Sequence, residues 1–174
     1  AASMVEYFKM QGLKTVLLSG DKEESCRSIA EQTGIEEVYS EKIPTEKHEV
    51  IQSLKKTGKV IMIGDGINDS PSLATADTGI SFGSATQIAI SSSDIILMNE
   101  DNLLQIKKAH QLALATMLTI KQNLFWALFY NIIAIPVAAG GWLSPVISSF
   151  SMAFSDVIVI GNSIRLKFKN IFTT

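Results

Sequence analysis

Short, continuous apolar runs alternate with helical patterns over the first 101 residues of the chain. The apolar runs are Thr15–Leu18, Val60–Ile63, Thr78–Ser81 and Asp94–Met98. A continuous run, unlike an alternating one, is typical of a strand that is buried on both faces of a parallel sheet. The helical patterns between them are Glu23–Thr33, Thr45–Lys56 and a shorter one near Ser70–Ala76. This order predicts a doubly wound α/β sheet with functional loops at the carboxyl ends of its strands.

The last third of the chain has a different pattern, two apolar runs of twenty residues with almost no charge. Leu124–Leu143 contains no charged residue, and Pro145–Ile164 contains only Asp156. A helix of twenty residues is about 30 Å long, which is the thickness of a bilayer core. We therefore predict a two-helix transmembrane hairpin in this part of the chain.

The distribution of charge defines the limits of these parts. Residues 1–122 carry 12 Lys and Arg and 16 Asp and Glu, whereas residues 123–174 carry three basic residues and one acid. We expect an α/β domain over residues 1–101, a stalk helix over 102–122, the hairpin over 123–164 and a basic tail over 165–174. Basic residues flank the hairpin and none lies in its turn, so both ends of this segment are expected to be cytoplasmic.

The overall composition excludes several classes of protein. A net charge of −2 is not that of a polybasic nucleic-acid binder, and a hydrophobic content of 47% is not that of a disordered acidic chain. Cys26 is the single cysteine, which excludes a disulfide scaffold. His48 and His110 have no partner at metal-ligand spacing, so both are expected to be solvated. Candidate chemistry is therefore concentrated in the loops at the strand ends and in the apolar hairpin.

The loop MIGDGINDSP, at residues 62–71, directly follows a predicted strand. Asp65 and Asp69 are hard carboxylates four residues apart, and Gly66 between them permits a sharp turn. Both carboxylates can face one small cation such as Mg²⁺. This loop alone would also be explained as a surface turn.

A second polar loop, LLSGD at residues 17–21, follows an earlier predicted strand. The Ser19 hydroxyl and the backbone N–H of Gly20 are suited to phosphoryl oxygens. Lys47, near the start of a helix that Pro44 begins, adds a positive point charge. Three such features at successive strand and helix ends indicate phosphate chemistry.

The string GDGINDSPSLATADTGISFG, at residues 64–83, resembles the hinge signature of P-type ATPases, the ion pumps of the haloacid-dehalogenase superfamily. LLSGD resembles their Thr-Gly-Asp element with Ser19 in place of the threonine. IPTEK resembles the loop that bears their phosphate-side lysine, here Lys47. The resemblance covers nearly the whole chain, and it implies a haloacid-dehalogenase-like (Rossmannoid) parallel sheet, ATP as substrate and Mg²⁺ as cofactor.

The same resemblance implies a role for each residue of these loops. Asp65, together with Asp69, is expected to bind Mg²⁺, and Asn68 with Asp69 is expected to support the phosphate loop. Ser19 and Lys47 are expected to contact the phosphoryl group. The implied catalytic set is Ser19, Gly20, Asp21, Lys47, Asn68 and Asp69.

The two apolar runs resemble the last spans of the heavy-metal-transporting class, because they directly follow the phosphorylation domain and end near a short basic tail. Copper members of that class carry Tyr-Asn in the first span, which Tyr130 and Asn131 match. They carry Met, with Ser four residues later, in the second span. Met152 matches, whereas Asp156 replaces that serine and lies beside Ser155. The resemblance implies that these five residues bind the transported ion, with Cu⁺ favoured.

The residues of the hairpin also indicate an ion site by themselves. Pro136 lacks an N–H, which frees a backbone carbonyl one turn earlier, at membrane depth. Met152, Ser155 and Asp156 share a helical face, and a carboxylate in mid-span is costly unless it is functional or paired. Taken alone, Met152 is more simply interpreted as an ordinary packing residue. For Tyr130, a role at the membrane interface or in the core explains the sequence as well as ion binding does.

Several parts of such a pump are absent from the sequence. It contains no Asp-Lys-Thr-Gly motif with the phosphorylated aspartate, no ATP-binding insert, no actuator domain and no Cys-Pro-Cys-type span. The chain therefore resembles the C-terminal part of a pump, expected to be inactive without the N-terminal part. The strand that carries the nucleophile should lie between the strands ending at Leu18 and Ile63, so the sheet is expected to have a gap there.

The favoured hypothesis is a Cu⁺-exporting P-type ATPase of the plasma or inner membrane that works through an aspartyl-phosphate intermediate. A pump for Zn²⁺, Cd²⁺ or Co²⁺ is the alternative within the same family. A membrane-tethered haloacid-dehalogenase phosphatase would need its own nucleophilic aspartate upstream. A non-catalytic metal-binding or assembly subunit would require that this chain is a complete natural product.

Overall fold

The computed structural model describes residues 1–98, 104–141 and 144–168. The chain divides into two units, Ala1–Lys107 and Lys108–Thr174. Three predicted positions lie outside the described residues: the boundary after residue 101, the end of the first apolar run and the end of the basic tail.

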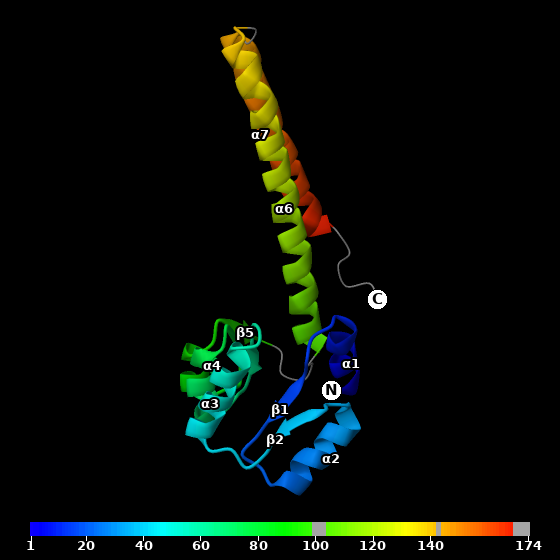
Figure 1. The fold of residues 1–174 in the computed structure, drawn as a ribbon, viewed down its shortest axis with the longest axis vertical. Helices are drawn as coiled ribbons and strands as arrows, with labels where there is room; N and C mark the ends of the chain where they lie inside the picture. Colours follow the sequence, from blue (N-terminus) through cyan, green and yellow to red (C-terminus); the bar gives the residue numbers. More distant parts are fainter. Residues whose placement is uncertain (99–103, 142–143, 169–174) are drawn as a thin grey trace. The chain divides into compact units, whose positions relative to one another are not determined.

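The described part of the first unit contains five short strands (Figure 1). They are β1 (Val16–Leu18), β2 (Glu37–Tyr39), β3 (Ile61–Ile63), β4 (Thr78–Phe82) and β5 (Ile95–Leu97). These strands form two sheets, β1–β2 and β3–β4–β5, in which every pairing is parallel. The four predicted strands are all present. No pairing joins β1 to β3 in the described residues, which is the arrangement expected if a strand between them is missing.

Short helices alternate with these strands. They are α1 (Ala2–Met10), α2 (Glu23–Thr33), α3 (Pro44–Lys55), α4 (Ser70–Thr75), α5 (Gln87–Ser91) and the 3₁₀ helix η1 (Ile67–Asp69). Gly34 ends α2 in the left-handed conformation, with φ of 80°, and its N–H donates to the Ala30 carbonyl at 2.7 Å. Pro44 begins α3 at a position where its missing N–H costs nothing.

The sequence prediction lacks four of these elements, α1, β2, α5 and the short 3₁₀ helix η1. β2 contains only Val38 and Tyr39 between polar neighbours, too short a run for a hydrophobic period to be recognised. α1 does carry such a period, since Val5 is buried and Met4 and Phe8 pack against the core. α5 has five residues and depends on its cap, in which Thr86 Oγ1 accepts the Ala89 N–H at 3.3 Å.

Two groups of buried apolar side chains form the core of the first unit. One consists of Ile51, Met62, Leu73 and Ala89. The other consists of Ile80, Leu97 and Ile106. Ile106 belongs to the long helix α6 (Leu104–Ala139), and Lys107 Nζ lies 4.9 Å from the centre of the Tyr7 ring. The first turn of α6 is therefore part of the packing of the α/β unit.

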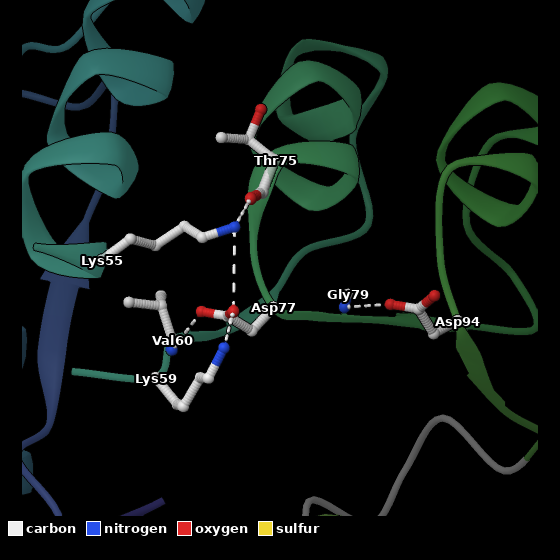
Figure 2. A network of polar contacts seen from close by, with 7 residues as sticks. All are labelled: Lys55, Lys59, Val60, Thr75, Asp77, Gly79 and Asp94. Carbon is white, nitrogen blue, oxygen red and sulfur yellow. Dashed lines mark hydrogen bonds and ion pairs between the residues drawn. The ribbon is translucent and has the colours of Figure 1, made fainter.

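Two aspartates hold the starts of neighbouring strands in register (Figure 2). Asp77 Oδ2 accepts the Val60 N–H at 3.0 Å, and the Asp77 N–H donates to the Val60 carbonyl at 2.9 Å. Asp94 repeats this arrangement with Gly79, at 2.8 Å and 2.9 Å. Each carboxylate thus satisfies a backbone donor at the start of a strand, where the ladder supplies no partner.

We expect the contribution of Asp77 to stability to depend on pH. Hydrogen bonds from Lys59 and then from the Val60 N–H lower the pKa of Asp77. A carboxyl group with a lowered folded-state pKa stabilises the fold above its ordinary pKa of about 3.9, and this contribution is lost as the pH falls through the folded pKa. Asp77→Asn should therefore lower the thermal unfolding midpoint at pH 7, and lower it less at pH values below about 3.

Thermal unfolding of the full-length protein in detergent at both pH values would check this expectation. Glu31→Gln is the matched control, because Glu31 is an exposed acid of α2 and should give little change at either pH. A loss that is the same at both pH values would show that the ionised form of Asp77 is not what stabilises the strands.

The second unit consists of α6, apart from its first residues, and α7 (Pro145–Phe168), which lie side by side in opposite directions (Figure 1). α6 runs from the predicted stalk into the first apolar run without interruption, as predicted, and it continues through Pro136. Among the described helices, α6 is the one long and apolar enough to cross a membrane. α7 covers the second predicted run, and its crossing of the membrane stays a prediction.

Candidate functional site

The centre of the candidate site is an ion pair between α3 and the loop after β3. Lys47 Nζ donates to Asp69 Oδ1 at 2.7 Å, and the two side chains are only 11% and 16% exposed. Lys47 lies one turn inside α3, where the Glu46 carboxylate accepts the Ile43 N–H at 3.0 Å and closes the first turn. A charge-assisted hydrogen bond that is shielded from water in this way is stronger than one on the surface.

The loop after β3 turns Asp69 inward and leaves Asp65 outside. Asp69 ends η1, and its N–H donates to the Gly66 carbonyl at 3.1 Å. Gly64 makes this turn possible, because a Cβ at that position would lie 2.9 Å from the Asp69 Cβ. Asp65 and Asn68 are exposed. The two carboxylates of this loop therefore have different environments, one paired with Lys47 and one exposed.

The loop after β1 is organised around a pair of side chains. Ser19 Oγ donates to Asp21 Oδ2 at 2.8 Å and accepts the Asp21 N–H at 3.2 Å. The carboxylate thus orients the hydroxyl of Ser19. Gly20 lies between them, and a Cβ there would be 3.3 Å from the Lys42 carbonyl oxygen, tighter than an ordinary contact.

The segment after β2 connects this serine loop to the helix that carries Lys47. The Ser19 N–H donates to the Tyr39 carbonyl at 2.9 Å, and the Lys42 N–H donates to the Ser19 carbonyl at 3.0 Å. The Glu41 N–H donates to the Asp21 carbonyl at 2.9 Å, and Glu41 has a φ of 55°. β2 and the turn after it are therefore part of the site, although the sequence prediction contains no strand there.

The structure brings the predicted catalytic residues together in two pairs. Lys47 contacts Asp69, and Ser19 contacts Asp21, whereas no hydrogen bond or ion pair joins these two pairs in the described part of the chain. Asn68 is exposed beside the first pair. A phosphoryl group is a chemically suitable bridge between them, because a lysine ammonium and a serine hydroxyl both donate to its oxygens.

The residues of the site are compatible with Mg²⁺. Among the described residues there is no group of three or more His, Cys, Asp or Glu side chains that could hold a metal ion. Mg²⁺ does not need such a group, because it commonly binds one or two carboxylates together with water and phosphate oxygens. Asp65, with its exposed carboxylate, fits this description, whereas one oxygen of Asp69 is already occupied by Lys47.

The expectation that His48 is solvated holds only in part, because the side chain is half-buried and both ring nitrogens have a partner. Thr75 Oγ1 lies 2.8 Å from His48 Nδ1, and Gln52 Nε2 lies 2.9 Å from His48 Nε2. Thr75 belongs to α4, so the imidazole links α3 to the helix that follows the Asp69 loop. The signal in the sequence was weak, because 27 residues separate His48 from Thr75.

In the second unit, two of the five predicted ion-binding residues share a pocket. Tyr130 of α6 and Ser155 of α7 line a cavity of about 190 Å³ that is otherwise mostly apolar. Asn131 is exposed, and its Nδ2 donates to the Ala127 carbonyl of its own helix at 3.0 Å. Met152 is 63% exposed, and Asp156 is also exposed. Within this unit the five residues therefore do not form one closed set of ligands.

Comparison with known proteins agrees with this fold and these loops. Residues 1–77 match the family of haloacid dehalogenase-like hydrolases. The deoxy-D-mannose-octulosonate 8-phosphate phosphatase of Haemophilus influenzae has the same fold, with a TM-score of 0.51 at 20% identity over 56% of this chain and 59% of its own. The parallel sheet of the first unit therefore has the haloacid-dehalogenase-like fold.

More similar proteins cover both units. A crystal structure of a zinc-transporting PIB-type ATPase gives a TM-score of 0.90 at 29% identity, over 95% of this chain and 27% of that protein. The copper-exporting P-type ATPase of Mycobacterium tuberculosis is 48% identical over 90% of this chain and 21% of its own length. The probable copper-importing P-type ATPase A of Enterococcus hirae is 42% identical over 98% of this chain and 24% of its own length. Over nearly its whole length the chain is similar to one segment of the heavy-metal P-type ATPases, and it spans about a fifth of the length of these curated relatives.

Proposed function

We propose that the full-length protein is an ATP-driven exporter of a heavy-metal cation, with Cu⁺ as its main substrate, that works through an aspartyl-phosphate intermediate. The observation that carries the proposal is the shielded Lys47–Asp69 ion pair, which joins α3 to the loop after β3 of a haloacid-dehalogenase-like sheet. The names of the relatives at 42–48% identity support copper as the cargo.

In this proposal, the residues of the first unit position and neutralise a phosphoryl group rather than attack it. Lys47 donates to a phosphoryl oxygen while Asp69 holds its side chain in place. Ser19 donates to another oxygen, with Asp21 orienting its hydroxyl and the Gly20 N–H adding a backbone donor. Positioned donors of this kind supply most of the catalysis in phosphoryl transfer.

We assign the Mg²⁺ ligand role to Asp65, and a supporting role to Asp69 and Asn68. Mg²⁺ bound there would neutralise charge on the phosphoryl oxygens. Asp65 is the better ligand because its carboxylate is exposed, whereas Lys47 occupies one oxygen of Asp69. The backbone of Asp65 is fixed independently of its side chain, since its carbonyl accepts the Thr86 N–H at 3.2 Å.

For the membrane part, we propose that residues of both helices bind the transported ion. The five residues are Tyr130, Asn131, Met152, Ser155 and Asp156. Met152 is a soft thioether suited to Cu⁺, whereas Asp156 is a hard oxygen ligand suited to divalent ions. Three of the five are exposed in this chain, which leaves them available to ligands from other spans of the full-length protein. Asp156 acts as a charge partner or weak ligand in the exit path.

We also propose a membrane topology for this part of the protein. Residues 1–101 form the cytoplasmic phosphorylation unit, 102–122 the stalk, 123–164 the hairpin and 165–174 a cytoplasmic tail. Both ends of the segment then lie on the side of the membrane where ATP is hydrolysed, in a plasma or inner membrane. Three basic residues after the hairpin favour this orientation.

The choice of ion can be tested by measuring the ATPase activity of the full-length protein with different metals. We expect Cu⁺ to stimulate hydrolysis more than Zn²⁺ or Co²⁺. Met152→Ala should weaken the Cu⁺ response, because a thioether ligand is lost, and Asp156→Ser should leave copper selectivity largely unchanged. Met117→Ala is the matched control, since Met117 is also an exposed methionine of the second unit but lies outside the predicted set.

A preference of the wild type for Zn²⁺ that Asp156→Ser abolishes would overturn the copper assignment in favour of a divalent-metal pump. An activity that releases phosphate from small phosphate esters, with no response to any metal cargo, would instead favour a membrane-tethered phosphatase.

A further inference from the structure

Four polar side chains join α6 to α7 away from the residues assigned to the ion. Asn123 Nδ2 donates to Ser163 Oγ at 2.9 Å, and Asn162 Nδ2 donates to Asn123 Oδ1 at 2.8 Å. Asn162 Nδ2 also lies 3.3 Å from Gln122 Oε1. We call these four residues, Gln122, Asn123, Asn162 and Ser163, the amide clamp.

The amide clamp lies at one end of the apolar part of the hairpin. Asn123 directly precedes the uncharged run that begins at Leu124, and Asn162 lies three residues before Arg165. Hydrogen bonds between helices in or near the bilayer stabilise one pairing of residues over others, because lipid offers no replacement partners. In helical bundles, a polar residue in an otherwise apolar seam specifies register in this way. The amide clamp has the composition and the location of such a register device.

The spacing of the sequence connects the amide clamp to the pocket. Asn123 and Tyr130 are seven residues apart on α6, and Ser155 and Asn162 are seven residues apart on α7. Seven residues make about two turns, so each pair lies on one face of its helix. Because the helices run in opposite directions, the pairing of Asn123 with Asn162 sets Tyr130 level with Ser155. This agrees with the pocket, which both of these side chains line.

We propose that the amide clamp sets the register of α6 against α7 and thereby positions Tyr130 opposite Ser155. Asn123 and Asn162 are positioning residues in this proposal, since they act through the two residues of the pocket. A slip by one helical turn would move these residues apart by about 5.4 Å. The consequence for ion binding rests on the proposed function, whereas the register itself does not.

The register can be measured by disulfide cross-linking in the full-length protein, in membranes, with cysteines only at two introduced positions. Trp126→Cys with Ile158→Cys reports the observed register, because Trp126 lies three residues after Asn123 and Ile158 four residues before Asn162, so the pairing of Asn123 with Asn162 sets them nearly level. Trp126→Cys with Phe154→Cys reports a slip by one turn. When Asn123→Leu and Asn162→Leu are added, we expect the ratio of the first cross-link to the second to fall by about fivefold or more.

Thr119→Val is the matched control for this measurement. Thr119 is a polar residue one turn from the amide clamp, but its Oγ1 donates at 3.0 Å to the Ala115 carbonyl of its own helix. The control should leave the cross-linking ratio unchanged. An unchanged ratio in the double leucine variant would overturn the proposal. If that variant does not insert, Asn162→Ala provides the same comparison with a smaller change.

The effect on ion binding is measured on the full-length protein by titrating metal-stimulated ATPase activity with Cu⁺. Asn162→Leu should raise the metal concentration for half-maximal stimulation by about tenfold, with a smaller change in the maximal rate. Adding Asn123→Leu should raise this concentration little further, because both substitutions disrupt the same hydrogen-bonded group. Asn162→Gln, which keeps an amide at this position, should retain part of the wild-type response to Cu⁺. Additive effects of the two leucine substitutions, or a shifted cross-linking ratio with an unchanged Cu⁺ titration, would overturn the positioning role. A wild-type protein without any metal response would refute the proposed function, and cross-linking would still decide on the register.

Discussion

Lys47→Met should reduce phosphoenzyme formation from ATP in the full-length protein by at least about a hundredfold. The substitution removes a positive donor from the proposed phosphoryl site, and it leaves Asp69 as an unpaired carboxylate that is only 16% exposed. Breaking one partner out of a buried ion pair costs about 3–5 kcal/mol, so the thermal unfolding midpoint should fall as well. Radiolabelled phosphoenzyme and thermal unfolding would be measured on the same preparations.

Further variants separate the effect of displacing the Asp69 carboxylate from the effect of losing the Lys47 charge. Gly64→Ala keeps both charges but introduces a Cβ only 2.9 Å from the Asp69 Cβ, so it should displace the carboxylate from Lys47 and also reduce phosphorylation. Gly58→Ala is its control, because no atom lies within 4 Å of a Cβ at that position. Lys56→Met controls for the loss of a lysine at the exposed end of α3. A phosphoenzyme level in Lys47→Met equal to that in Lys56→Met would remove Lys47 from the phosphoryl site.

The sheet of the first unit could be predicted to the extent that its strands are continuous apolar runs. The continuous apolar runs that became β1, β3, β4 and β5 gave a strong signal. Burial on both faces, which such runs predict, is found for β4, whereas Ile61 of β3 and Ile95 and Ile96 of β5 are exposed. β2 has no such signal, because Glu37 and Tyr39 flank a single aliphatic residue. It could have been inferred from topology, since a helix closed by Gly34 in a parallel sheet must be followed by another strand. The gap between β1 and β3 was predictable because it follows from chain order rather than from local pattern.

The residues of the candidate site were predictable, but their pairing was not. The sequence suggests that Asp65 and Asp69 face one cation, because both are carboxylates in one loop. The structure gives Asp69 a lysine partner that lies 22 residues earlier in the chain, and such a contact depends on how α3 packs beside η1. The different environments of the two carboxylates thus come from tertiary packing, which no spacing rule contains.

In the hairpin, too, the helices could be predicted from the sequence but the contacts between them could not. Uncharged runs predicted α6 and α7, and the continuity of α6 followed from the absence of a breaker between Gln122 and the first apolar run. The amide clamp was not predicted, because Asn123 and Asn162 are 39 residues apart and each alone is an ordinary interfacial residue. The available signal was an amide in each of two otherwise apolar segments. In a membrane, such groups need a partner, and the other segment is the nearest source of one.

Asp65→Asn should abolish Mg²⁺-dependent phosphorylation of the full-length protein. The amide has nearly the same shape, so the loop that the Asp65 carbonyl holds through Thr86 should be unchanged. What the substitution removes is the negative charge that a hard divalent cation requires. We therefore expect at least about a hundredfold less phosphoenzyme at ordinary Mg²⁺ concentrations, with an unchanged thermal unfolding midpoint in the absence of Mg²⁺.

Asp69→Asn is the informative comparison, because it should give a different result. The side chain at position 69 is not needed as a ligand in this assignment. The substitution does remove the anionic partner of Lys47, which is 11% exposed, so the unfolding midpoint should fall even without Mg²⁺. Titration of phosphoenzyme formation with Mg²⁺ in both variants would separate the two roles. Near-normal phosphorylation of Asp65→Asn would exclude Asp65 from the metal site. If excess Mg²⁺ partly restored phosphoenzyme formation in Asp69→Asn but not in Asp65→Asn, the cation would be assigned to Asp69 instead.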